Sequence, residues 1–151
     1  MPQVVTCVVI YQERILLLRR SDKVRTYKGQ WGGVAGYVEP GEHPRQTAYK
    51  ELREEVGLTP DLVALIFQED PISFTDVYQG ERYDWTIHPF LFELLKHQEM
   101  KIDWEHTEYR WVHPDELTRY QTVPHFTKTV QSMMRKMRMG EHGGVVRKRE
   151  E

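Results

Sequence analysis

The chain has 151 residues, of which 39% are hydrophobic and 29% charged, so it is long enough for one domain with a layered core. A net charge of −2 excludes the basic surface that duplex nucleic acid requires. The longest apolar runs fall far below the ~18–20 residues that span a bilayer. The N-terminus lacks a secretory pattern, and the lone cysteine, Cys7, cannot form an internal disulfide. We therefore expect a cytoplasmic protein.

The first third of the chain favours strands. Residues 4–11 are rich in β-branched side chains and predict a strand, with residues 15–18 as its hairpin partner after a polar turn. Residues 21–30 are polar and basic and predict an exposed loop. Residues 31–38 alternate glycines with apolar side chains, which indicates that the backbone closely approaches a neighbour there.

Residues 44–56 predict a helix. Pro44 suits a first helical position, and Gly57 suits the left-handed residue after the end. Three carboxylates, at Glu51, Glu54 and Glu55, stand at i, i+3 and i+4 and share one face. Like charges at that spacing repel, and a hard divalent cation such as Mg²⁺ would relieve the repulsion.

The second half of the chain predicts more strands and a closing helix. Residues 62–68 and 72–78 favour strands, and residues 83–95 predict a central strand in which Pro89 marks a bulge or an edge. A short strand at 109–112, a short helix from His113 and a final helix that opens at Val123–Pro124 and runs to about Met137 follow. We expect residues 140–151 to be disordered. This order favours a mixed sheet between helices.

Residues 36–58 also carry a specific motif. Gly36, Glu42 and the segment Lys50–Leu58 fall at the spacing G-x5-E-x7-R-E-U-x-E-E-x-G-U, where U is aliphatic. This segment resembles the signature of the Nudix hydrolases at every fixed position except Lys50, where the family has arginine. The resemblance implies an α/β/α sandwich with a mixed sheet, over a domain that we place at residues 1–139. It also implies hydrolysis of a diphosphate linkage with Mg²⁺ or Mn²⁺.

The resemblance assigns roles position by position. It makes Glu51, Glu54 and Glu55 metal ligands, with Glu54 central to catalysis and the Gly36 carbonyl as a further ligand. Glu42 is expected to hold the loop before the helix. MutT-like members carry a catalytic or metal-binding glutamate ahead of the last short strand. Glu105 occupies a comparable position here, and Glu108 is the alternative.

Three residues are candidates for substrate contact. MutT-like relatives use an arginine like Arg20 on the substrate phosphates, although a solvated loop arginine is an equal alternative. Trp31 and Tyr37 flank the glycine-rich segment and could stack on a base, and core packing is the competing interpretation for Trp31. His43 is expected to cap the helix rather than to act in catalysis.

The leading hypothesis is a Mg²⁺-dependent enzyme that cleaves a nucleoside triphosphate to the monophosphate and pyrophosphate. One alternative is a non-catalytic nucleotide-binding regulatory module on the same fold. Another is cleavage of a nucleotide sugar or a coenzyme A type substrate. An isomerase of the isopentenyl diphosphate type is disfavoured, because that chemistry uses a cysteine that Cys7 is poorly placed to supply. The expected partner is a small-molecule nucleotide, and the resemblance leaves a homodimer open.

Overall fold

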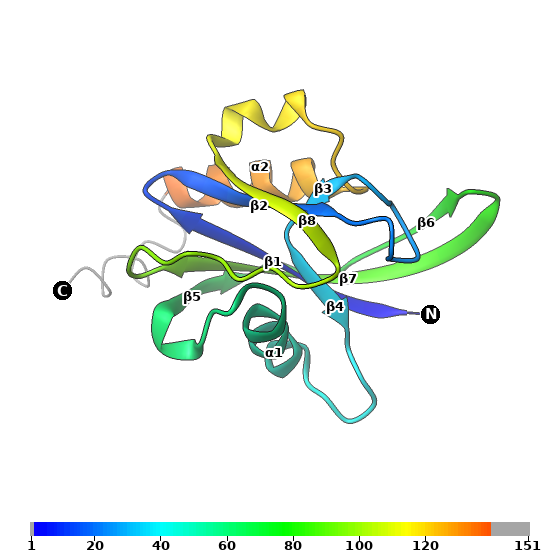
Figure 1. The fold of residues 1–151 in the computed structure, drawn as a ribbon, viewed down its shortest axis with the longest axis horizontal. Helices are drawn as coiled ribbons and strands as arrows, with labels where there is room; N and C mark the ends of the chain where they lie inside the picture. Colours follow the sequence, from blue (N-terminus) through cyan, green and yellow to red (C-terminus); the bar gives the residue numbers. More distant parts are fainter. Residues whose placement is uncertain (1, 140–151) are drawn as a thin grey trace.

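The fold is that of a computed structural model, which describes residues 2–139 (Figure 1). The predicted tail at residues 140–151 lies outside the described residues. The strands are β1 (Gln3–Tyr11), β2 (Arg14–Arg20), β3 (Trp31–Gly32), β4 (Val34–Tyr37), β5 (Val63–Gln68), β6 (Ile72–Tyr78), β7 (Glu81–Leu94) and β8 (His106–Val112). The helices are α1 (Pro44–Val56) and α2 (Phe126–Arg138), with short 3-10 helices η1 (Pro60–Leu62) and η2 (Pro114–Arg119).

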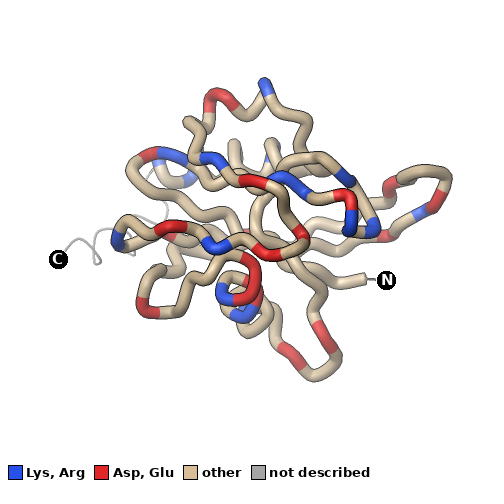
Figure 2. Tube along the Cα trace, viewed as in Figure 1, with Lys and Arg blue, Asp and Glu red and all other residues tan. Residues whose placement is uncertain are grey.

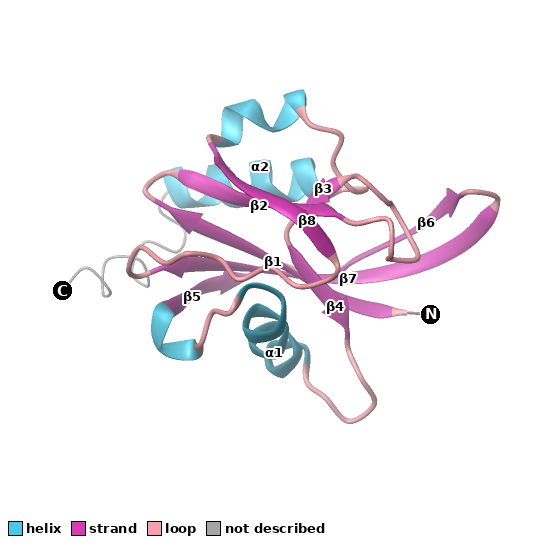
Figure 3. Cartoon of the chain, viewed as in Figure 1, coloured by secondary structure: helices cyan, strands magenta, loops and turns pink. Residues whose placement is uncertain are grey.

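The strands form one mixed sheet with the order β3-β2-β1-β7-β5, to which β4, β6 and β8 add as partners of β1, β7 and β2. β1 runs parallel to β7, with Cys7 opposite Phe90, and the other strand pairs are antiparallel. α1 covers one face of the sheet and α2 the other (Figure 3). The predicted α/β/α sandwich with a mixed sheet is confirmed.

Each face of the sheet has its own core because side chains alternate along β1. Val5, Cys7 and Val9 pack in a cluster with α1, whereas Val8 packs in a second cluster with α2. Ala48, Leu52 and Val56 supply the apolar stripe of α1. Phe126, Val130 and Met133 supply that of α2. Among the described residues, no helix is long and apolar enough to cross a membrane.

The caps of α1 explain its bounds, which match the prediction. The His43 Nδ1 atom accepts a hydrogen bond from the Arg45 N–H at 3.2 Å, and the Gln46 Oε1 atom accepts from the His43 N–H at 2.8 Å. At the other end Gly57 has φ 76°, a left-handed backbone that costs glycine little. His43 therefore caps the helix, as expected.

Pro89 was predicted to mark a bulge or an edge, and that prediction is wrong. β7 is continuous and lies inside the sheet, paired with β1 along one side. On its other side β6 pairs with residues 81–87 and β5 with residues 90–94. Pro89 stands where one partner strand ends and the next begins, so its missing N–H breaks no pair on that side.

The segment between β2 and β3 is a loop, as predicted, but only part of it is exposed. Four of its side chains are buried, namely Ser21, Val24, Thr26 and Tyr27. The close approach predicted from the neighbouring glycines is confirmed at Gly33, where an added Cβ would lie 2.6 Å from the Cys7 carbonyl oxygen. Several bounds differ from prediction by one to three residues. β8 begins at His106 rather than at 109, and the left-handed His125 (φ 68°) delays the start of α2 to Phe126.

Candidate active site

Three carboxylates meet at one end of α1. Glu51 and Glu55 lie one helical turn apart and turn toward the loop before β8, which contributes Glu105. One oxygen from each of the three lies within 4.8 Å of the others. Glu105 is held at both backbone atoms: its carbonyl accepts from the Ser21 N–H at 2.8 Å, and its N–H donates to Asp103 Oδ1 at 3.1 Å. We call Glu51, Glu55 and Glu105 the acid cluster.

Burial dominates the electrostatics of the acid cluster. The Glu55 side chain is almost fully buried, and only its Oε1 atom has a donor, the Ala35 N–H at 3.4 Å. The Oε2 atom has no hydrogen-bond partner among the described residues. Burial, reinforced by the neighbouring acids, raises the pKa of Glu55 well above its ordinary value. Burial is also the first cause of the raised pKa values of Glu51 and Glu105.

His106 adjoins the acid cluster, and no sequence motif pointed to this residue. Its Nε2 atom lies 3.8 Å from Glu55 Oε1 and its Nδ1 atom 3.6 Å from Asp103 Oδ1. Burial lowers the pKa of His106 to about 4, so the imidazole is neutral at pH 7. The one signal in the sequence was its position directly after Glu105. A single histidine there does not reveal that its side chain is buried beside Glu55, which lies on α1.

Gly36 explains how Glu51 reaches the sheet. A Cβ built at Gly36 would lie 2.4 Å from the Glu51 Cδ atom and 2.6 Å from its Oε2 atom. The carboxylate of Glu51 thus occupies the space that any other residue at position 36 would fill. The close backbone approach predicted from the glycines is confirmed here too.

The acid cluster suits a divalent cation. Its donors are all carboxylate oxygens, the ligands that Mg²⁺ and Mn²⁺ prefer. Without a cation, the structure holds three partly or fully buried acids together and leaves a buried oxygen of Glu55 without a partner. Such a group is costly unless it binds a proton or a metal ion. The residues present therefore fit the metal that the sequence motif implied.

A cavity of about 140 Å³ opens on the side of the sheet opposite α1. Its floor crosses β4, β1 and β7, and β6 completes the wall. The aromatic and apolar lining includes Tyr27, Tyr37, Phe74, Trp85 and Ile87, and the polar lining includes Thr6, Arg20, Thr26 and Glu105. Gly36 and Glu105 belong both to this lining and to the surroundings of the acid cluster.

Arg20 and Tyr37, two of the three predicted substrate contacts, line this cavity. The Arg20 Nε atom donates to the Thr26 carbonyl at 2.8 Å, and Nη2 donates to Thr26 Oγ1 at 3.4 Å. Burial lowers the pKa of Arg20, while the nearby Glu105 opposes that effect. Tyr37 is half exposed, and its ring centroid lies 6.3 Å from that of Trp85.

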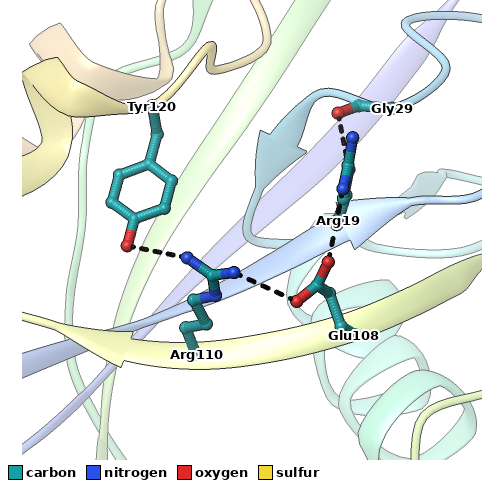
Figure 4. Close-up of polar contacts among 5 residues, drawn as sticks. All are labelled: Arg19, Gly29, Glu108, Arg110 and Tyr120. Atoms are coloured by element: carbon teal, nitrogen blue, oxygen red, sulfur yellow. Dashed lines mark hydrogen bonds and ion pairs between the residues drawn. The ribbon is translucent and has the colours of Figure 1, made fainter.

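Trp31 lies elsewhere, in the core cluster on the α2 side. Its ring meets the edge of Tyr120 at 5.3 Å, and the Arg110 guanidinium lies over it at 5.0 Å. Figure 4 shows Arg110 bonded to Tyr120 and to Glu108, which also pairs with Arg19. Glu108, the alternative to Glu105, is thus engaged in surface ion pairs and does not join the acid cluster.

Glu54 lies on α1 next to Glu55 but is exposed and is not one of the three acids that converge. Its catalytic role stays a prediction. Figure 2 shows acidic segments of α1 and of the loop before β8 facing each other, with basic segments along the loop between β2 and β3. An anionic ligand would meet that basic loop at the rim of the cavity.

Lys50 replaces the arginine of the motif, and the structure shows what it contacts. Its Nζ atom lies 2.6 Å from Glu42 Oε2, and Glu42 Oε1 accepts from the Glu39 N–H at 3.1 Å and from Thr47 Oγ1 at 2.8 Å. The Lys50 hydrogen bond is the first cause that lowers the pKa of Glu42 to about 2. Glu42 therefore holds the loop before α1, as expected, and Lys50 bonds to it.

Comparison with known proteins agrees with this geometry. A family model described as the NUDIX domain matches residues 1–133. The nucleoside triphosphatase NudI of Escherichia coli O1:K1 / APEC is 30% identical over 109 residues, which span 70% of this chain and 77% of NudI.

Two solved structures share the fold. The C. elegans Ap4A hydrolase in a binary complex superposes with a TM-score of 0.75 at 17% identity, over 91% of this chain and 98% of that chain. The E. coli dihydroneopterin triphosphate pyrophosphohydrolase superposes with a TM-score of 0.73 at 22% identity, over 86% and 92% of the two chains.

Proposed function

The chain belongs to the Nudix hydrolase family, and on that premise we propose that it hydrolyses a nucleoside triphosphate to the monophosphate and pyrophosphate. The observation that carries the proposal is the double placement of Glu105, which stands in the acid cluster and also lines the cavity. A ligand in the cavity therefore lies next to the group of carboxylates that suits a metal ion. The name of the relative NudI, a nucleoside triphosphatase, supports the same substrate class.

In this proposal Glu51 and Glu55 of the acid cluster hold Mg²⁺ or Mn²⁺, with the Gly36 carbonyl as a further ligand that the motif implies. Glu54 and Glu105 complete the site, one as a ligand and the other as the base. The metal, when bound, supplies neutralisation of phosphate charge and a lowered pKa for a water molecule. Arg20 binds a phosphate of the substrate with its guanidinium, and Tyr37 and Trp85 offer aromatic faces to the base.

Glu105 and Glu54 are the two candidates for the general base. The base takes one proton from a water molecule, the water oxygen bonds to a phosphorus atom, and the bond from that phosphorus to the bridging oxygen breaks, which yields the monophosphate and pyrophosphate. Burial raises the pKa of Glu105, which brings that carboxyl nearer to the neutral range where a base is most effective. Glu54 is exposed and belongs to the motif position that is central to catalysis in relatives.

The test is a substrate panel with the purified protein and Mg²⁺ or Mn²⁺. It contains nucleoside triphosphates with each base, a nucleotide sugar and a coenzyme A derivative, and the phosphate-containing products are separated by anion exchange. We expect monophosphate and pyrophosphate from one or more triphosphates. Turnover confined to the sugar or coenzyme A compounds would reassign the substrate, and nucleotide binding without any product would favour the regulatory module.

A second experiment tests whether each of the two candidate bases takes part in the reaction. Glu54→Gln and Glu105→Gln are each expected to fold and to lower kcat by at least about 10²-fold, since each loses a metal ligand or a base. Glu108→Gln is the matched control, because it removes a nearby acid that pairs with Arg19 and Arg110 instead. Full activity in either test variant would remove that residue from the mechanism.

A further inference from the structure

The Tyr27 hydroxyl, on the loop between β2 and β3, contacts both strands of the β6–β7 hairpin at the cavity. Tyr27 is only 8% exposed, and its hydroxyl donates to Asp76 Oδ2 at 2.7 Å. The same oxygen accepts a hydrogen bond from the Trp85 Nε1–H at 3.1 Å. A single group on the loop thus bonds to β6 and to β7 at once.

The backbone at Tyr27 is strained in a way that fits this contact. Its φ is 54°, a left-handed conformation that is uncommon for a bulky residue and persists where the surroundings impose it. The ring is fixed by neighbours on the hairpin, because its centroid lies 4.9 Å from that of Tyr78 and 6.4 Å from that of Trp85. This backbone conformation accompanies a side-chain position in which the hydroxyl bonds to Asp76 on β6 and to Trp85 on β7.

The Trp85 indole depends on this hydroxyl for its polar contact. The side chain is 7% exposed and stacks on Tyr83, with centroids 5.3 Å apart and planes 8° apart. Stacking leaves a ring free to slide in its own plane, and a directional N–H bond stops that motion. Trp85 lines the cavity beside Tyr37, so its orientation sets the shape of the aromatic wall.

The preceding residue anchors the same loop independently. Thr26 accepts two hydrogen bonds from Arg20 and is buried. Loss of the Tyr27 hydroxyl would therefore release the indole without releasing the loop or Arg20. The phosphate side and the base side of the cavity are held by different contacts, which allows an experiment to separate them.

We propose that Tyr27 is a positioning residue whose hydroxyl fixes the Trp85 indole in the wall that receives the nucleobase. The inference rests on the proposed function. Base stacking is equally strong in the ground state and the transition state, so this wall contributes uniform binding energy. Loss of the hydroxyl should therefore raise KM and leave kcat nearly unchanged.

Tyr27→Phe tests this inference, with Tyr78→Phe as the matched control. The Tyr78 hydroxyl also joins loop to hairpin, because it accepts from the Lys28 N–H at 3.0 Å, but it has no bond to the indole. We expect Tyr27→Phe to raise KM by about 5–30-fold, with kcat within about threefold, and Tyr78→Phe to stay within about twofold of wild type. Equal effects of the two variants, or an unchanged KM in Tyr27→Phe, would overturn the inference.

A double-mutant cycle with Trp85→Phe shows whether Tyr27 acts through the indole. In the Trp85→Phe background, where no N–H remains, Tyr27→Phe should change KM by no more than about twofold. If the two changes multiply independently, the hydroxyl acts by another route and the inference fails. Urea unfolding of each variant identifies any general loss of structure.

A binding measurement keeps this outcome separate from that of the proposed function. Calorimetry with a nucleoside monophosphate and Mg²⁺ is run on the same proteins, so the comparison does not require turnover. If the wild-type protein binds the nucleotide but hydrolyses no triphosphate, the proposed function is wrong. A weaker nucleotide affinity of Tyr27→Phe would in that case still support the inference. Wild type that binds no nucleotide would overturn both.

Discussion

Glu55 is a buried acid that the fold holds beside two others. One of its oxygens has a backbone donor and the second has no partner among the described residues, so the ionised side chain is poorly solvated. A protein selected only for stability would not keep this arrangement, and sites of function are where such costs are retained. The buried carboxylate that destabilises the metal-free protein is also one of the three candidate ligands of a divalent cation.

Glu55→Gln should therefore stabilise the metal-free protein at pH 8. The pKa of Glu55 is raised above 4.5 in the folded state, so its stabilising proton is fully bound below pH 4.5 and is lost as pH rises through the folded pKa. Glutamine mimics the protonated form at every pH. We expect a thermal midpoint higher by about 2–8 °C at pH 8 in EDTA, and a difference that vanishes near pH 4.

The exposed neighbour provides the control for this measurement. Glu54→Gln removes the same charge from the adjacent position and should shift the midpoint far less, because its carboxylate is solvated. A lower midpoint for Glu55→Gln at pH 8 would contradict the argument that burial of the charge is costly.

At the scale of single elements, the loop before α1 depends on the Glu42–Lys50 contact. Glu42 joins a loop amide, the Thr47 hydroxyl and the Lys50 ammonium group. These bonds fix the entry to the helix that carries two of the clustered acids. Lysine keeps the charge of the arginine in the motif but binds as a single point.

Lys50→Gln should lower the thermal midpoint at pH 7. The pKa of Glu42 falls from 4.5 to about 2 on folding, so its contribution to stability is present above pH 4.5 and is lost as pH falls toward 2. The difference between Lys50→Gln and wild type should shrink over that same window. Lys50→Arg keeps the cation and should behave like wild type, and a pH-independent difference for Lys50→Gln would argue against the ion pair as the cause.

The strands β2, β3 and β8 meet η2 around Trp31, which supports a second prediction at this scale. Trp31→Ala should reduce the free energy of unfolding by about 3–5 kcal/mol, as large aromatic truncations in a core do. KM should stay within about twofold, because Trp31 does not line the cavity. Urea unfolding and steady-state kinetics give the two readouts. A folded variant with unchanged stability and a raised KM would instead place Trp31 in a substrate site, as one of the sequence hypotheses had it.

Local elements were the most predictable part of the chain. The bounds of α1 followed from Pro44 and Gly57, whose backbone preferences are local. The burial of Tyr27 was not predictable, because it depends on Asp76 and Trp85 far along the sequence. The motif placed Glu51, Glu54 and Glu55 on one face, yet only the packing of α1 on the sheet decides which of them converge with Glu105.

At the scale of the whole molecule, the acid cluster and the cavity lie toward different faces of the sheet and share lining residues. The acid cluster lies at the α1 side, the cavity opens on the opposite side, and Gly36 and Glu105 connect them. Both faces of the sheet are packed on their own core, so the relative positions of cluster and cavity are fixed by the fold. A ligand of the acid cluster is thus expected to stabilise the entire domain.

Mg²⁺ should therefore raise the thermal midpoint of the protein. At a free concentration 100 times the dissociation constant, mass action adds about 2.7 kcal/mol. For a chain of this length the midpoint should rise by about 5–11 °C. Differential scanning fluorimetry in Mg²⁺ and then in excess EDTA measures the gain and its reversal, with NaCl at matched ionic strength as control. If Mg²⁺ leaves the thermal midpoint of the wild-type protein unchanged, as it should in Glu55→Gln, the acid cluster holds no metal.

The change of partner at Pro89 divides β7 into two stretches with separate tasks. Residues 90–94 lie against β5 and carry Phe90, Phe92 and Leu94 into the core, whereas residues 81–87 lie against β6 and form a wall of the cavity. Figure 1 shows β6 and this outer stretch extending past the body of the molecule. Substitutions in the outer stretch are therefore expected to reshape the cavity wall while the inner stretch leaves the core intact.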